Sequence, residues 1–128
     1  MLPPATDLLD MLASWPEVSN PRIIEYEVDA GVVLMYKIRC DLPEGYSLQI
    51  RLRLRAGKIE YSYQLFTTKP VLRWDNAPHH PSLARFPHHF HDDTDATYLS
   101  NLSGDPLADV PMVLAKVTDY IKRSEGGK

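Results

Sequence analysis

Apolar and polar residues alternate without a break over residues 48–55, and this alternation predicts a strand with one buried face. Residues 59–66 repeat the pattern after an Ala-Gly-Lys turn. Residues 22–28, 32–40 and 71–75 are rich in the β-branched and aromatic residues that favour strands. Because turn residues separate neighbouring segments, the pattern predicts about five antiparallel strands, each paired with the next along the chain.

Helical periodicity is confined to the two ends of the chain. Residues 8–15 place three leucines, a methionine and a tryptophan on one helical face, and Pro16 ends this helix. Residues 112–123 carry a second apolar stripe, for which Asp109 is the expected N-cap and Pro111 lies in the first turn. Each stripe indicates a helix that packs against a core.

The elements come in the order helix, strands, long loop and helix, without β-α-β alternation. This order predicts one α+β domain over residues 1–128, an antiparallel meander sheet of about five strands with the N- and C-terminal helices packed on one face. Residues 1–20 form the N-terminal helix and linker, residues 92–105 a loop with a short extended piece at 96–99, and residues 124–128 a flexible tail. The uncovered face would display Arg51, Arg53 and Arg55.

Composition narrows the class of protein. The formal net charge is −3, which argues against a protein whose whole surface binds nucleic acid. Cys40 is the single cysteine, so an intrachain disulfide and a cysteine-based zinc site are both excluded. The N-terminus lacks a signal peptide, and no apolar run approaches the roughly 18 residues of a membrane span. We therefore expect a cytoplasmic protein that does not enter a membrane.

All five histidines fall in one segment that follows the last predicted strand: His79, His80, His88, His89 and His91. Imidazole exchanges protons near neutral pH, so a pair of histidines can serve as base and acid in one turnover. Cleavage of RNA by attack of its own 2′-hydroxyl needs such a pair and a cation for the charged transition state. Arg73 precedes the segment and could supply that cation.

Two other interpretations stay open. His88, His89 and His91 with Asp92 or Asp93 have the ligand types of a transition-metal site, although no HExxH motif is present, and the metal set would be His88, His91 and Asp92. The segment can also be structural, with Asp75 and Asn76 capping a turn. The outward arginines serve either solubility or the binding of phosphates or an acidic partner.

Two motifs carry a resemblance to a known family. The segments Arg-Trp-Asp-Asn-Ala-Pro-His-His-Pro at 73–81 and Pro-His-His-Phe-His at 87–91 follow a tyrosine-bearing strand. Together they resemble the TumE-like family of prokaryotic toxin-antitoxin proteins, over roughly residues 22–122. The resemblance implies a growth-inhibiting toxin whose partner is a small helix-turn-helix antitoxin. It implies these candidate site residues: Arg73, Asp75, Asn76, His79, His80, His88, His89 and His91.

The sequence thus supports two functions of different classes. One is a metal-independent ribonuclease toxin, which needs no cofactor and holds RNA phosphates with Arg51, Arg53 and Arg55. The other is a non-enzymatic module that acts through protein contacts, with a metal-binding protein as a weaker variant. A homodimer is a further candidate assembly.

Overall fold

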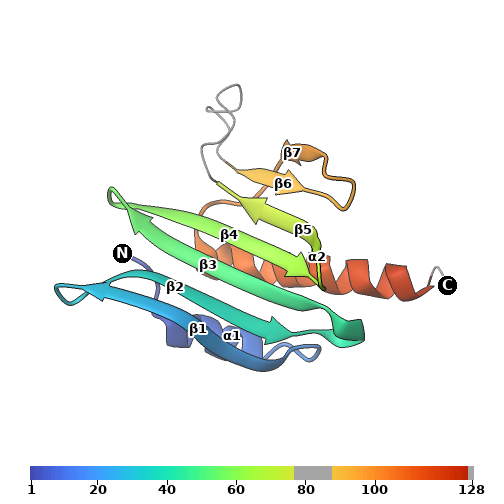
Figure 1. Ribbon diagram of the computed structural model, residues 1–128, viewed down its shortest axis with the longest axis horizontal. Coiled ribbons are helices and arrows are strands. Elements are labelled where there is room, and N and C mark those ends of the chain that lie inside the picture. Colours follow the sequence, from blue (N-terminus) through green and yellow to red (C-terminus); the bar gives the residue numbers. More distant parts are fainter. Residues whose placement is uncertain (77–87, 127–128) are drawn as a thin grey trace.

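A computed structural model describes residues 1–76 and 88–126, so His79 and His80 lie outside the described residues. Figure 1 shows a twisted antiparallel sheet with a helix near each end of the chain on the same face. The elements are α1 (Ala5–Ala13), β1 (Ser19–Asp29), β2 (Val32–Asp41), the 3₁₀ turn η1 (Pro43–Gly45), β3 (Ser47–Arg55), β4 (Lys58–Phe66), β5 (Pro70–Asp75), β6 (His89–His91), β7 (Thr97–Leu99) and α2 (Pro106–Gly126). The predicted α+β class and meander order are confirmed.

The sheet has seven strands in the order β1 to β7, and each strand pairs antiparallel with the next. The prediction of about five strands leaves out β6 and gives β7 only as a short extended piece at 96–99, and each of these strands has only three residues. So short a segment contains a single period of alternation, and two of the three residues of β6 are histidines. These two strands extend the sheet beyond β5 and carry two of the candidate site residues.

Two hairpins have the same two-residue turn. Ala30 and Gly31 join β1 to β2 with φ angles of 49° and 77°, and Ala56 and Gly57 join β3 to β4 with φ angles of 51° and 75°. Two successive positive φ angles define the type I′ turn, whose twist matches that of the flanking strands. The register set by the second turn runs unbroken between β3 and β4 and places their alternating apolar residues on one face, whereas the register between β1 and β2 shifts at three points.

The core lies between the sheet and the two helices. Cross-strand rows such as Ile38, Ile50, Tyr63 and Trp74 are almost wholly buried on the helix-covered face. The helices fill the other side of this core with Leu8, Leu12, Val113, Leu114, Val117 and Ile121. Within the described residues, neither helix is long and apolar enough to cross a membrane. The opposite face of the sheet is left open, as the alternation predicts.

Helix α2 begins earlier than the sequence indicates. Asp105 caps it, because its Oδ1 accepts a hydrogen bond from the N–H of Leu107 at 3.2 Å, and the helix starts at Pro106. Asp109 is not the N-cap; it is buried and accepts hydrogen bonds from the N–H groups of Ser103 and Gly104 at 2.9 and 2.8 Å. The prediction of Asp109 as N-cap is therefore wrong, and residues 124–126 of the expected tail belong to the helix.

Candidate functional site

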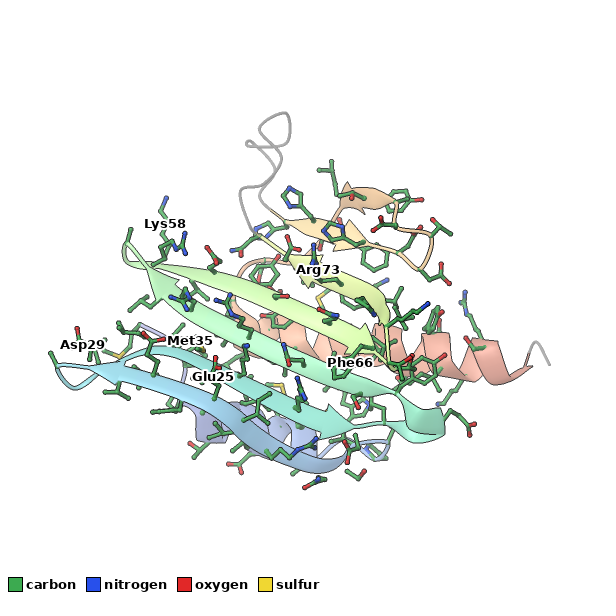
Figure 2. All side chains as sticks on the ribbon, in the orientation of Figure 1. Glu25, Asp29, Met35, Lys58, Phe66 and Arg73 are labelled. Atoms are coloured by element: carbon green, nitrogen blue, oxygen red, sulfur yellow. The ribbon has the colours of Figure 1, made fainter. Side chains whose placement is uncertain are left out.

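The candidate site lies on the open face, where β5 and β6 pair. The strand register sets Asp75 opposite His89 and Arg73 opposite His91. Alternation along each strand puts all four side chains on the face away from the helices. Figure 2 shows Arg73 on β5 in this position. The site therefore follows from sheet geometry. Arg73 and Asp75 are separated by one residue on β5, and they face His91 and His89, which are separated by one residue on β6.

Asp75 is the centre of the cluster and is only 5% exposed. Its Oδ2 lies 2.8 Å from Nε of Arg73 and 3.2 Å from Nε2 of His91. Its Oδ1 lies 3.5 Å from Nδ1 of His89. A buried carboxylate needs charged or hydrogen-bonding partners, and here one guanidinium and two imidazoles surround it. We define these four residues, Arg73, Asp75, His89 and His91, as the Asp75 cluster.

His91 has a partner in either protonation state. Its Nε2 lies 3.4 Å from Nη2 of Arg73 as well as 3.2 Å from Oδ2 of Asp75, and its Nδ1 lies 3.2 Å from Oγ1 of Thr97. With its hydrogen on Nε2 the ring donates to Asp75 and accepts from the Thr97 hydroxyl, and with its hydrogen on Nδ1 it donates to Thr97 and accepts from Arg73. The protonated ring donates to Asp75 and to Thr97. A histidine held beside a carboxylate in this way has the arrangement of a general base.

The two imidazoles of the cluster differ in exposure. The side chain of His91 is 14% exposed and that of His89 is 2% exposed. The Arg73 side chain is 43% exposed, so part of its guanidinium faces solvent beside the carboxylate. Arg73 and His91 are therefore the members that a dissolved substrate can reach in the described structure. The side chains of Asp75 and His89 are almost fully buried.

His88 belongs to the opposite face of the sheet. Its Nδ1 lies 2.8 Å from the hydroxyl of Tyr61, and the two rings stack with centroids 5.8 Å apart. Burial raises the pKa of Tyr61, so its hydroxyl stays protonated, and it donates to His88 or accepts from it according to the tautomer of the ring. A Cβ added at Gly104 would come 3.2 Å from Cε1 of His88, so the ring is also closely packed from that side. The structure therefore separates His88 from His89 and His91.

Asn76 extends the sheet with its side chain. Its Oδ1 accepts a hydrogen bond from the N–H of Tyr61 at 2.8 Å, and its Nδ2 donates to the carbonyl of Ile59 at 2.9 Å. These are backbone groups of β4 beyond the end of β5 at Asp75. The side-chain amide thus makes the hydrogen bonds to β4 that the backbone of one more strand residue would make. It holds the carboxyl end of β5, where Asp75 sits, against β4.

The three outward arginines of β3 lie on the same open face and have acidic neighbours. Glu60 lies 3.8 Å from Arg51 and 3.6 Å from Arg55, and Glu27 lies 4.0 Å from Arg53. Arg51 stands in the cross-strand row that continues through Ser62 to Asp75, two strands away. At the usual strand spacing this separation is about 10 Å. The arginines therefore border the Asp75 cluster without belonging to it.

The proposed metal set does not come together in the described structure. His88 and His91 lie on opposite faces of the sheet, and the Oδ1 atom of Asp92 accepts hydrogen bonds from the Thr94 hydroxyl and from the N–H groups of Thr94 and Ala96. The hydrogen bond from the Thr94 hydroxyl lowers the pKa of Asp92. Among residues 1–76 and 88–126, no three His, Cys, Asp or Glu side chains are grouped as metal ligands.

Sequence reasoning missed the partners that hold the histidines. Thr97 on His91 and Tyr61 on His88 are brought in by the register of β7 and by the inner face of β4. Neither residue has a local motif that could have revealed this role. The alternation rule would have separated His88 from His89 and His91 if β6 had been recognised as a strand.

Taken together, fold and site define an α+β protein with a carboxylate-centred imidazole cluster on an open sheet face. A family model described as Toxin TumE matches residues 9–124. The chain therefore belongs to the TumE toxin family, as the motifs at 73–81 and 87–91 suggest. Comparison with curated proteins and with solved structures gives no match. A toxin of such a family is paired with an antitoxin.

Proposed function

We propose that this toxin acts in the cytoplasm by cleaving RNA at the Asp75 cluster, without a metal ion, and that its partner is a helix-turn-helix antitoxin. The observation that supports the proposal best is the position of His91. Its Nε2 lies between the carboxylate of Asp75 and the guanidinium of Arg73, at 3.2 and 3.4 Å. Family membership supports the toxin role, and the geometry suggests the chemistry.

The reaction would proceed by attack of the 2′-oxygen on the neighbouring phosphorus. His91 accepts the proton of the 2′-hydroxyl at Nδ1, the nitrogen that faces Thr97, as the new P–O bond forms, and Asp75 beside Nε2 stabilises the imidazolium. The bond from phosphorus to the 5′-oxygen breaks, and that oxygen takes a proton from a second acid. This acid stays a prediction among His79, His80 and His89. The products are a 2′,3′-cyclic phosphate and a 5′-hydroxyl, with no oxidant or further reactant needed.

Arg73 supplies the positive charge that the reaction needs. Its guanidinium is partly exposed and already oriented by Asp75 at 2.8 Å. Negative charge develops on the phosphoryl oxygens in the transition state, and a fixed cation beside them lowers the barrier without reorganisation. Arg51 and Arg53 would bind flanking phosphates of the RNA across the open face. Such contacts add affinity without sequence preference.

The experiment compares His91→Ala with His88→Phe in the presence of a chelator. The first change removes the proposed base, and RNA cleavage and growth arrest should fall by at least about a hundredfold. The second removes an imidazole from the other face while keeping a ring against Tyr61, so cleavage should persist. Both variants are checked for a native melting transition. Equal cleavage by the two variants would show that the Asp75 cluster is not the active site.

A second candidate function rests on the arginine neighbours. Because Glu60 and Glu27 compensate Arg51, Arg53 and Arg55, the open face is less basic than the sequence alone indicates. Such a mixed surface also suits a protein partner, and the toxin would then act by binding rather than by cleavage. Growth arrest that survives in both His91→Ala and Asp75→Asn, with no RNA turnover by the wild type, would favour this candidate.

A further inference from the structure

The first strand of the sheet has an open edge. β1 is eleven residues long and forms one end of the strand order, so within the described residues only β2 pairs with it. Nearly all of its side chains are exposed. A long edge strand with unpaired N–H and C=O groups is a template for another strand. Natural proteins shield such edges, and here the shielding consists of Pro21, three irregularities of register and the charged side chains of the strand.

The helix-side face of this edge is apolar. Ile23, Tyr26 and Val28 are 40, 51 and 51% exposed, although their cross-strand neighbours on β2 are mostly buried. A groove of about 650 Å³ runs beside them, between the N-terminal segment and the β1–β2 hairpin, and its lining includes Leu2, Pro4, Val32 and Tyr36. One further strand would cover these side chains and fill the groove with alternate residues of its own.

Two glutamates project on the other face of the same edge. The side chains of Glu25 and Glu27 are 50 and 49% exposed, and toward the sheet they lie 3.6 Å from Lys37 and 4.0 Å from Arg53. Asp29 follows at the end of β1, is exposed, and makes no ion pair with another described residue. Figure 2 shows Glu25 and Asp29 along this strand. An added strand would therefore place every second side chain beside acidic groups.

We propose that β1 is the docking edge for an extended polypeptide segment in which apolar and basic residues alternate. The segment adds an eighth strand, with its apolar side chains in the groove and its Lys or Arg side chains beside Glu25, Glu27 and Asp29. In a toxin family the natural source of this segment is the antitoxin, and to that extent the inference rests on the proposed function. The edge lies at the far end of the sheet from the Asp75 cluster.

A second copy of the chain fits this edge less well. Pairing of β1 with β1 of another copy would bring a second Glu25 and Glu27 onto the same edge, and like charges there disfavour association. The other terminal strand, β7, is three residues long and follows the acidic loop of Asp92, Asp93 and Asp95. The arginine-rich strand β3 is already paired on both sides. Charge therefore favours a basic partner of different sequence.

The test uses a fluorescent ten-residue peptide of alternating valine and lysine, with a valine-glutamate peptide for comparison. Fluorescence anisotropy at low salt should show binding of the lysine peptide alone, and hydrogen exchange should show added protection in β1. Glu25→Lys combined with Asp29→Lys should weaken this binding at least about tenfold and favour the glutamate peptide. Asp10→Lys combined with Asp119→Lys makes the same change of net charge elsewhere and also breaks one ion pair, Asp119 to Arg123, so its binding should stay unchanged.

Three results would overturn the inference: no binding by the wild type, equal loss in the two double variants, or a wild-type dimer in sedimentation whose β1 amides are protected without peptide. Tyr26→Ser provides a second check, because it removes apolar surface without changing charge and should weaken binding. Growth arrest and RNA cleavage by the Glu25→Lys, Asp29→Lys variant are measured in parallel. They should persist, so failure of the docking edge and failure of the proposed active site give different results.

Discussion

Replacing Asn76 by alanine tests how the end of β5 is attached to the sheet. The change removes two hydrogen bonds, of 2.8 Å from the Tyr61 N–H and of 2.9 Å to the Ile59 carbonyl. Each is worth about 1 kcal/mol, and two partly buried backbone groups lose their partner as well. We expect the free energy of unfolding to fall by about 2–3 kcal/mol. For a domain of this size the melting temperature should drop by roughly 8–12 °C.

Urea unfolding and thermal unfolding give the measurement. The midpoint should fall with an unchanged slope, because the surface exposed on unfolding stays the same. Gln64→Ala is the matched control: Gln64 is half-buried on the same pair of strands and makes no hydrogen bond to another described residue through its side chain, so the loss should stay below about 1 kcal/mol. If Asn76→Ala lowers the free energy of unfolding no more than Gln64→Ala does, the reasoning is refuted.

The same change should reach the Asp75 cluster, the proposed active site. Asp75 precedes Asn76, and the position of its carboxylate between Arg73 and the two imidazoles depends on the pairing of β5 with β4. RNA cleavage by Asn76→Ala should therefore fall at temperatures well below its melting point. Asn76→Asp keeps the acceptor for Tyr61 but sets a carboxylate oxygen against the Ile59 carbonyl, so its free energy of unfolding should also fall.

Three further outcomes follow from local geometry. Ala56→Asn should raise stability by about 0.5 kcal/mol in thermal unfolding, because asparagine tolerates the positive φ of a type I′ turn better than alanine. Tyr61→Phe removes the hydroxyl group that is hydrogen-bonded to His88, so the free energy of unfolding in urea should fall by about 1–2 kcal/mol while RNA cleavage persists. Burial raises the pKa of Cys40 from 9.0 to about 12, so the unfolded thiol ionises first and stability should fall as pH rises above about 9; Cys40→Val should lessen this fall in pH-dependent unfolding.

Much of the fold follows from alternation alone. The pattern of β3, with every second residue apolar, leaves no other arrangement that buries Leu48, Ile50 and Leu52 together, and β4 takes its register from the two-residue turn at Ala56 and Gly57. The start of α2 was harder to predict. Asp105 and Asp109 are both suitable caps, and only the backbone of Ser103 and Gly104, which folds onto Asp109, decides between them.

The candidate site was only partly predictable. Its residue types and its place after β5 were evident, because Arg73 and Asp75 stand two apart at the end of a strand. The pairing of Asp75 with His89 and His91 depends on β6, a strand that contains only a single period of alternation. The separation of His88 depends on Tyr61, which is distant in sequence. Long-range register thus decides which imidazoles share a carboxylate.

The most direct test of the central claim is cleavage of an RNA oligonucleotide by the purified toxin in a chelator, with products identified by mass spectrometry. The account predicts a 2′,3′-cyclic phosphate and a 5′-hydroxyl, no cleavage where the 2′-hydroxyl is replaced by hydrogen, and loss of both products in His91→Ala. Cleavage of the 2′-deoxy substrate, or wild-type activity in His91→Ala, would contradict it.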